Sequence, residues 1–362
     1  MKVVVESRAS GHRLVFVRLL IDHLHHQNEP FAFVTNGTVI DSVEFKDNLR
    51  SRLSDEELTV LSTPHIGPRE VYRLAAQLDA TQIIVPDGDG FARELLRFPR
   101  LWGRVPLVLL IIHDPRWERS ELGWPSRHSV AKWLALSLLQ SRLARRIRVK
   151  FLAAASGSSP SKHAVSDPVI IEDDFLTIRK AAEKNRRRLA MDESVTWIGV
   201  VGVISKYKNI AILIDAVERL NRRGTHRVGL ALLGPVQPNY KAEVADLARR
   251  LSRSSISLVI DDEVRSNSQV NIDVASLDIV SVLYSVNCTN STMAKAAALG
   301  VKTLAAGPPG FRKIYHETTG HAAQPLDVER VTDDLERLLI EPQPEPSLTP
   351  QPELFPIQLL RD

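Results

Sequence analysis

The sequence predicts an α/β protein built on two doubly wound parallel sheets. Buried-strand patterns alternate with amphipathic helix patterns, polar residues collect directly after strand ends, and the alternation restarts after a charged interval near the middle. At 362 residues the chain also exceeds the usual size of one domain. We therefore expect domains at 1–170 and 195–340, joined by a linker at 171–194. The Pro-rich tail, 341–362, should be extended or disordered unless its apolar end docks on the body.

Composition narrows the class of protein. Charged residues make up 25% and hydrophobic residues 44% of the chain, as in ordinary soluble globular proteins. The one cysteine, Cys288, excludes an intrachain disulfide and argues against a structural zinc site. The N-terminus lacks the apolar core of a signal peptide, and no apolar run reaches membrane-spanning length. We expect a cytoplasmic protein without a metal or other cofactor and without a nucleic-acid partner.

The first half contains four strand patterns, which are KVVVES, FAFVTN, IIVPDGDG and PLVLLIIHDPRW. Ligands of doubly wound sheets bind beyond the carboxyl ends of the strands, so polar residues that follow these patterns are candidate site residues. Three spaced glycines of the dinucleotide fingerprint are absent, which disfavours a nicotinamide enzyme. The candidates are Gly11 after the first strand, Asp87 and Asp89 after the third, and His113 and Asp114 after the fourth.

Residues 116–150 form a basic segment that also contains three tryptophans and a Leu-rich face. Nine Lys or Arg stand there against Glu118 and Glu121. Such a segment suits the surface of an anionic membrane or a polyanionic partner. The alternative is a solvated helix whose apolar side packs on the sheet. The basic residues are Arg116, Arg119, Arg127, Lys132, Arg142, Arg145, Arg146, Arg148 and Lys150.

The second half repeats the alternation from Val195 onward. VTWIGVVG is a strand pattern, VISKYKN a loop, and IAILIDAVERLNRRG a helix pattern closed by Gly224. Further on, Asp278–Gly310 has the order strand, polar turn, helix and strand, as in a parallel sheet. Unpaired amides at that helix start, with hydroxyl and amide side chains beside them, predict a phosphate cradle. The alternative is that Ser291 or Thr292 only caps the helix. The cradle residues are Thr289, Asn290, Ser291 and Thr292.

Several of these stretches resemble family 4 glycosyltransferases. WIGVVGVISKYKNIAILIDAVERL resembles the family's strand ending in Gly, its basic loop and the following helix, and LALLGPVQPNYKAEVADLARRL resembles the next strand and helix. Asp278–Gly310 is similar to the segment that bears the family's paired glutamates, and Glu6–Asn36 to the opening strand, loop and helix. The resemblance covers residues 2–337. It implies two Rossmann-like domains with parallel sheets facing across a cleft, the GT-B architecture, with a nucleotide-sugar donor held mainly by the second.

The resemblance also implies a donor site in the loop after the strand that ends at Gly202. The family's loop places an Arg directly after this glycine and a Lys five residues later, both on the donor diphosphate. Here Val203 replaces the Arg, while Lys208 stands in the Lys position. We expect Lys206 to compensate for the missing Arg, and Ser205 lies in the same loop.

The family's two glutamates, with seven residues between them, are replaced by Asn287 and Lys295. In the family the first contacts the transferred sugar and the second the nucleotide ribose. Asn287 can still exchange hydrogen bonds with sugar hydroxyls, whereas a charged Lys295 cannot accept one from ribose and would reach a phosphate or face solvent. His113 matches a family histidine beside the sugar and the reacting carbon, and with Asp114 and Asp87 it is our acceptor-side prediction.

The leading hypothesis is a glycosyltransferase that moves a sugar from a nucleotide-sugar donor to a carbohydrate or glycolipid acceptor, at or near the inner face of a membrane. The resemblance implies retention of configuration without a metal, with the leaving phosphate taking the acceptor proton. An inverting enzyme would need a base, such as Asp87, Asp89 or Asp114. The alternative, motivated by the missing Arg and glutamates, is a GT-B-like binding or scaffold protein without catalysis. A sugar-nucleotide epimerase is a third hypothesis, which lacks a supporting acidic or His cluster in the second half.

Overall fold

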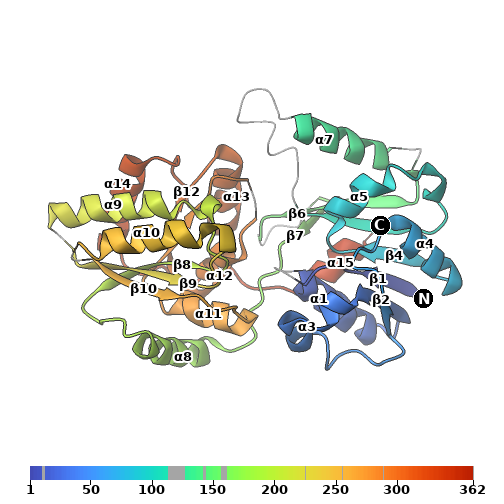
Figure 1. Ribbon diagram of the computed structural model, residues 1–362, viewed down its shortest axis with the longest axis horizontal. Helices are drawn as coiled ribbons and strands as arrows, with labels where there is room; N and C mark the ends of the chain where they lie inside the picture. Colours follow the sequence, from blue (N-terminus) through green and yellow to red (C-terminus); the bar gives the residue numbers. More distant parts are fainter. Residues whose placement is uncertain are drawn as a thin grey trace. The chain divides into compact units, whose positions relative to one another are not determined.

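The computed structural model describes residues 1–9, 13–112, 127–141, 144–155, 161–224, 226–254, 256–287 and 289–361. The chain divides into two compact units (Figure 1). The first comprises Met1–Ala153, Ser159–Asp167 and Gln351–Asp362, and the second comprises Ala154–Ser158 and Pro168–Pro350. Each unit holds one parallel sheet with helices on both faces, so the predicted fold class is confirmed.

The sheet of the first unit has seven strands in the order β3-β2-β1-β4-β5-β6-β7, and all of their pairings are parallel. Its strands are β1 (Lys2–Val5), β2 (Phe31–Asn36), β3 (Leu58–Leu61), β4 (Gln82–Val85), β5 (Leu107–Ile111), β6 (Ile147–Ala153) and β7 (Ala164–Ser166). The helices are α1 (Arg13–His26), α2 (Gly37–Ile40), α3 (Val43–Asn48), α4 (Pro68–Gln77), α5 (Gly88–Leu95), α7 (Arg127–Leu139) and α15 (Leu354–Leu360), with a 3₁₀ turn, η1 (Pro99–Leu101).

Alternate residues of these strands feed two separate cores. Val3 and Val5 of β1 pack with α4 and α5, whereas Val4 packs on the opposite face with α1, α3 and α15. Both faces of each central strand are therefore buried, which explains why these strands appear in the sequence as continuous apolar runs. β3 lies at the sheet edge and is only partly buried. It has no such run, and the sequence predicted only a polar, partly helical region there.

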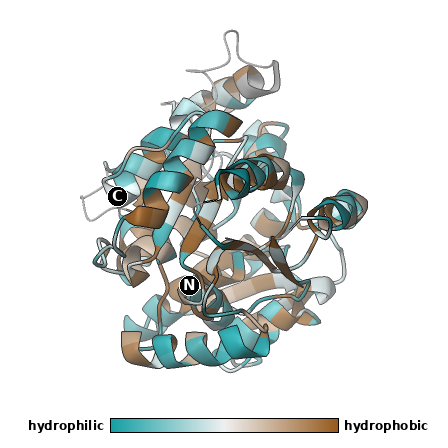
Figure 2. Cartoon of the chain, turned by 90° about the vertical axis from the view of Figure 1, so that its left-hand side faces the viewer, coloured by the Kyte–Doolittle hydropathy of each residue, from teal (hydrophilic) through white to brown (hydrophobic). Residues whose placement is uncertain are grey.

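The second unit has a five-stranded parallel sheet in the order β10-β9-β8-β11-β12. Its strands are β8 (Thr196–Val201), β9 (Val228–Leu233), β10 (Ser257–Asp261), β11 (Ile279–Leu283) and β12 (Lys302–Ala306). Its helices are α8 (Phe175–Arg188), α9 (Ile210–Arg223), α10 (Lys241–Leu251), α11 (Asn267–Ala275), α12 (Ser291–Leu299), α13 (Pro309–Thr319) and α14 (Val328–Ile340), with 3₁₀ turns η3 (Lys206–Lys208) and η4 (Pro238–Tyr240). Figure 2 shows hydrophobic strands between helices whose outer faces are hydrophilic.

The interval expected as a linker, 171–194, contains α8. Asp174 caps this helix by accepting hydrogen bonds from the amides of Leu176 and Thr177, both at 3.0 Å. The buried Asn185 donates to Asp273 of α11 at 3.1 Å, so α8 packs as part of the second unit. The many charged side chains on the outer surface of α8 give this interval the composition of a linker, although the helix has a buried side.

The apolar end of the Pro-rich tail docks on the first unit as α15. Phe355 stacks on Phe16 with ring centroids 4.8 Å apart, and both rings are buried. The side chains of Arg148 and Lys150 donate to the carbonyls of Leu360 (3.1 Å) and Arg361 (2.7 Å). Lys150 is buried in β6, so the basic segment predicted at 116–150 is not a single surface feature. Within the described ranges, no helix is long and apolar enough to cross a membrane.

Candidate functional site

The two sheets share one topological feature, a point where the strand order reverses. In the first sheet, β1 lies between β2 and β4. In the second sheet, β8 lies in the same way between β9 and β11, so in each sheet the first strand is flanked by the second and the fourth. The connections that leave the first and fourth strands therefore depart to opposite sides and open a crevice at the carboxyl edge. This topology points to the residues after β8 and β11 in the second unit, and after β1 and β4 in the first.

In the second unit, two glycines bring the loops after β8 and β9 together. Gly202 has φ +81°, and Gly234 has φ +139°. A Cβ at Gly234 would lie 2.5 Å from the carbonyl oxygen of Gly202, closer than any side chain tolerates. The loop that begins at Gly202 therefore depends on glycine at both positions for its path.

Lys208 lies inside this loop and is buried, with 6% of its surface exposed. Its ammonium donates a hydrogen bond to the carbonyl of Val201 at 2.6 Å, and a Cβ at Gly202 would lie 3.6 Å from its Nζ. An alternative in which Lys208 is an exposed charge beside the helix is therefore wrong. Lys206 is exposed, while Ser205 is buried with no hydrogen-bond partner for its hydroxyl among the described residues.

The loops after β8 and β11 are tied to each other by backbone and side-chain hydrogen bonds. Asn209, in the left-handed conformation with φ 48°, donates to the carbonyls of Tyr207 (2.9 Å) and Leu283 (3.1 Å). The amide of Ser285 donates to the carbonyl of Tyr207 at 3.0 Å. The rings of Tyr207 and Tyr284 also lie 5.7 Å apart. These contacts hold the loop containing Lys208 against the turn that leads to α12.

The cap of α12 differs from the capping alternative that the sequence offered. The cap is Asn290, whose side-chain oxygen accepts from the amides of Thr292 (2.8 Å) and Met293 (3.2 Å). Ser291 and Thr292 therefore do not provide the cap, and the amide of Thr292, one of those predicted to cradle a phosphate, is already bonded. The Nδ2 group of buried Asn290 has no partner in the described structure. Thr289 and Ser291 are partly exposed beside it.

The two residues that replace the family's glutamates lie in different surroundings. Asn287 accepts a hydrogen bond from the amide of Phe311 at 2.8 Å, which ties the turn to α13. Lys295 is 3% exposed, and its ammonium donates to the side-chain oxygens of Asn271 (2.5 Å) and Asn267 (2.6 Å) and to the carbonyl of Ile170 (3.3 Å). The expectation that Lys295 could face solvent is wrong, because amide oxygens enclose its charge.

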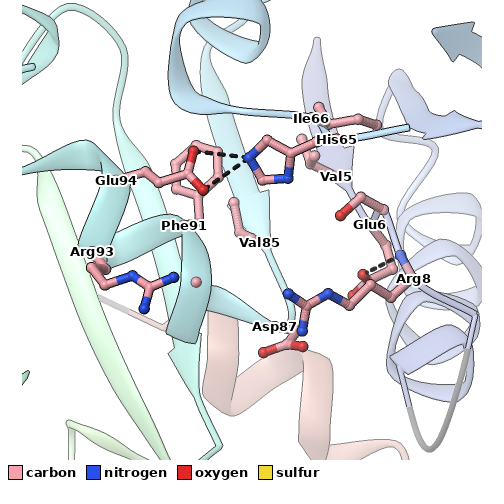
Figure 3. A pocket seen from close by; sticks show the side chains of 12 residues that line it. Val5, Glu6, Arg8, His65, Ile66, Val85, Asp87, Phe91, Arg93 and Glu94 are labelled. Atoms are coloured by element: carbon pink, nitrogen blue, oxygen red, sulfur yellow. Dashed lines mark hydrogen bonds and ion pairs between the residues drawn. The ribbon is translucent and has the colours of Figure 1, made fainter. Parts of the chain in front are cut away.

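In the first unit, the residues after β1 and β4 line a pocket (Figure 3). Asp87 forms an ion pair with Arg13 at 2.5 Å, across the ends of the two strands. Asp89 lies in the first turn of α5. It forms an ion pair with Lys132 (2.6 Å) and accepts a hydrogen bond from the amide of Ile112 (3.1 Å). The other predicted residues of this region, Gly11, His113 and Asp114, lie outside the described residues.

The most perturbed group of this pocket is Glu6, which is not among the residues predicted from the sequence. Burial, reinforced by the negative charge of Asp87, raises the pKa of Glu6 from 4.5 to about 8. One of its oxygens accepts from the amide of Arg8 at 2.9 Å, and the other has no hydrogen-bond partner among the described residues. The signal in the sequence is a carboxylate placed directly after a buried strand, which is the position that a switch point selects.

The chemistry of both candidate sites is that of cations, amides, hydroxyls and carboxyls. Among the residues that the structure describes, no three His, Cys, Asp or Glu side chains gather in a way that could hold a metal ion.

The fold of the chain is the two-domain GT-B fold, as comparison with solved structures shows. No protein-family model matches the sequence, and neither does any curated protein. One similar structure is the Anabaena protein HepE in complex with UDP and glucose, with a TM-score of 0.64 and 14% identity over 99% of this chain and 95% of that one. Another is sucrose-phosphate synthase from Thermosynechococcus elongatus, with a TM-score of 0.63 and 11% identity over 99% of this chain and 92% of that one. A third is a glycosyltransferase from Rickettsia africae (TM-score 0.61, 11% identity, 93% and 87%).

Proposed function

We propose that this protein is a glycosyltransferase that transfers a sugar from a nucleotide-sugar donor to a carbohydrate or glycolipid acceptor. The observation that carries the proposal is the buried ammonium of Lys208 at the switch point of the second sheet, beside Gly202. A buried cation at the carboxyl edge of a doubly wound sheet suits a diphosphate. The GT-B fold of HepE, whose structure contains UDP and glucose, supports the same assignment.

In this proposal the diphosphate binds Lys208, while the exposed Lys206 replaces part of the charge lost with the family's Arg. Ser205 and Asn290, whose buried donors lack partners among the described residues, extend the site towards the phosphates. Thr289, Ser291 and Thr292 flank it, and Asn287 binds the transferred sugar. The chemical demand is to stabilise the negative charge that develops on the leaving phosphate. The transfer would then retain configuration and need no metal, with His113, Asp114 and Asp87 on the acceptor side.

A second candidate is a GT-B protein that binds a nucleotide sugar without transferring it. The observation in its favour is Lys295, because its charge is fully engaged by amide oxygens and offers no acceptor to a ribose hydroxyl. Donor binding would then rest on the diphosphate alone, without the ribose contact that the resemblance implies.

Donor hydrolysis with a panel of nucleotide sugars separates the two candidates. A glycosyltransferase should bind one nucleotide sugar and slowly release its sugar to water, and Lys208→Ala should weaken this binding by about tenfold to a hundredfold. Binding without release under any condition favours the second candidate. No binding of any nucleoside diphosphate contradicts the donor site itself.

The proposed location is the inner face of a membrane, with α7 as the contact. Val130, Leu134 and Leu138 of this helix are exposed, and Leu134 is the most exposed of them at 55%. Arg145 and Arg146 are exposed directly after it in the sequence. Apolar side chains with neighbouring cations suit the interface of an anionic bilayer. Arg142, part of the same expectation, lies outside the described residues, and Lys132, Arg148 and Lys150 bind groups of the protein itself.

A further inference from the structure

The first unit contains a cavity of about 60 Å³ at the carboxyl ends of β1 and β4. A pocket of this size has room for several waters or for a small polar group. The cavity lies entirely within residues 5–94, so the first unit builds it alone. Its ionisable lining residues are Glu6, Arg8, His65, Asp87, Arg93 and Glu94.

Glu6 supplies the buried end of this cavity. It is 4% exposed, and Figure 3 shows its carboxyl group turned towards the pocket. One oxygen of this carboxyl group accepts a hydrogen bond from the amide of Arg8. The other oxygen has no partner among the described residues. A buried polar group without a partner costs stability, so this oxygen marks the place where a ligand atom would bind.

With Arg13 included, three guanidinium groups stand around the cavity against the carboxylates of Asp87 and Glu94. Asp87 is paired with Arg13, and Glu94 is hydrogen bonded to His65 at 3.0 Å. Arg8 and Arg93 form no ion pair with any described residue, and Figure 3 shows their guanidinium groups on opposite sides of the pocket. Two arginines without carboxylate partners, facing one small cavity, suit an oxyanion that accepts several hydrogen bonds at once.

We propose that this pocket binds a phosphate group of the acceptor, with Arg8 and Arg93 neutralising its charge and the carboxyl group of Glu6 donating a hydrogen bond from the buried side. The proposal rests on the proposed function, because it names part of the acceptor. A phosphate suits the site better than a carboxylate, since its oxygens point in more directions and can meet donors from three sides. The acceptor would be a phosphorylated sugar or a phosphorylated lipid.

The protonation of Glu6 gives this site a pH dependence that an ordinary arginine pair lacks. Because the pKa of Glu6 is about 8, its carboxyl group is neutral and able to donate at pH 7. Above pH 8 it becomes an anion next to the bound phosphate and repels it. The charged groups around Glu6 are Asp87 and the guanidinium groups of Arg8 and Arg13, and a His65→Gln variant controls for the imidazole.

The test is calorimetric titration of the full chain with inorganic phosphate, with saturating UDP present so that the donor site cannot take up the probe. We expect Arg8→Gln and Arg93→Gln each to weaken binding about three- to tenfold. The matched control is Arg97→Gln, which removes an exposed arginine near Arg93 that does not line the pocket and should change nothing. Raising the pH from 7 to 9 also changes the charge of inorganic phosphate itself, so the two proteins are compared over the same range: binding to the wild type should weaken relative to binding to Glu6→Gln.

The proposal is overturned if phosphate does not bind, or if it binds the wild type and all arginine variants equally. It is also overturned if pH affects the wild type and Glu6→Gln equally. Circular dichroism of each variant shows whether it folds. A hexose 6-phosphate and phosphatidic acid in vesicles are then tested as competitors of inorganic phosphate, and the one that competes identifies the kind of acceptor. If neither competes, the proposal is also overturned. Nucleoside-diphosphate binding in the same preparations tests the donor site separately. Failure of phosphate to bind the first unit would therefore leave the proposed function intact, and failure of the nucleotide to bind would be seen independently.

Discussion

The two units arrange their first, second and fourth strands in the same way, yet their switch points are chemically opposite. In the second unit a buried cation, Lys208, is held by a backbone carbonyl, and the surrounding loops are tied to each other. In the first unit a buried acid, Glu6, keeps one oxygen without a described partner, beside two arginines that form no described ion pair. The shared topology thus places a candidate site in each unit, and a few side chains give the two sites opposite charges.

The two switch points also represent two ways of preparing a site. The donor-side loop uses its hydrogen bonds on itself, so its geometry exists before a ligand arrives. The pocket of the first unit keeps unsatisfied groups, so its ligand would complete the hydrogen bonding. Preorganised sites lose less entropy on binding, whereas incomplete sites gain stability from their ligand. Glu6→Gln, Gly234→Ala and Lys208→Ala test this contrast, and a last prediction concerns α7, which lies outside both switch points.

The largest expected effect concerns Glu6→Gln and the pH dependence of stability. The pKa of Glu6 is raised from 4.5 to about 8 in the folded protein, so between these values the native state binds a proton that the unfolded state has lost. The free energy of unfolding should therefore fall as pH rises through this window. A glutamine does not titrate, so the variant should not lose this stability. The difference in unfolding free energy between Glu6→Gln and wild type should therefore shift in favour of the variant by roughly 3 to 5 kcal/mol between pH 4.5 and 9.

Urea denaturation at pH 5, 7 and 9 in phosphate-free buffer measures this difference. Glu56→Gln, which removes an exposed glutamate of the same unit, is the control and should follow the wild type. Parallel pH profiles for Glu6→Gln and wild type would show that the Glu6 carboxyl group is not kept protonated.

The second effect concerns the close approach of Gly234 to Gly202. Gly234→Ala places a Cβ 2.5 Å from a backbone oxygen at φ +139°, so the unfolding free energy should fall by roughly 2 to 4 kcal/mol. Gly224→Ala is a matched control, because its φ of +71° is also left-handed but nothing lies within 4 Å of the added atom. It should cost about 1 kcal/mol. Equal losses in the two variants would contradict the idea that the loops after β8 and β9 constrain each other.

The third effect is on nucleotide binding. Lys208→Ala should weaken the binding of a nucleoside diphosphate by about tenfold to a hundredfold, since one charged hydrogen bond contributes roughly 1.5 to 3 kcal/mol. Lys206→Ala, which removes an exposed cation of the same turn, should weaken it less. Calorimetric titration measures both. Unchanged affinity in Lys208→Ala would remove its donor role and leave this ammonium as a structural group bound to Val201.

The smallest effect is expected on membrane association. Arg145→Glu should reduce co-sedimentation with anionic vesicles about fivefold, since each basic residue near a membrane contributes about 1 kcal/mol. Leu134→Glu should reduce it as well, because it places a charge on the apolar side of α7. Val43→Glu changes an equally exposed apolar residue of α3 and serves as the control. Co-sedimentation that none of these substitutions alters would rule out α7 as the contact.

The sequence predicted the fold because both sheets have central strands buried on two faces. The apolar runs of β1, β5, β8 and β11 follow from that burial. The strand order, and with it the position of each switch point, came only from the structure. The prediction missed β3, a short strand whose edge position leaves it partly exposed, so it lacks the long apolar run of the central strands.

Site residues were predictable only where their partners are close in sequence. The loop from Gly202 to Asn209 contacts itself and the strand before it, so the position of Lys208 could be identified. Lys295 could not be interpreted in this way, because its partners Asn271 and Asn267 are 24 and 28 residues away. Glu6 was missed for the same reason, since the surroundings that raise its pKa include Asp87, far along the chain.

The return of α15 to the first unit makes the second unit an insertion in the first. Both chain ends belong to the first unit, and the second is continuous from Pro168 to Pro350 apart from a short stretch at 154–158. A gene fragment for 168–350 would therefore encode nearly the whole donor-side unit in one piece. The first unit would require its final dozen residues to be joined to residue 167 by a short linker, because without them the face around Phe16 loses its cover.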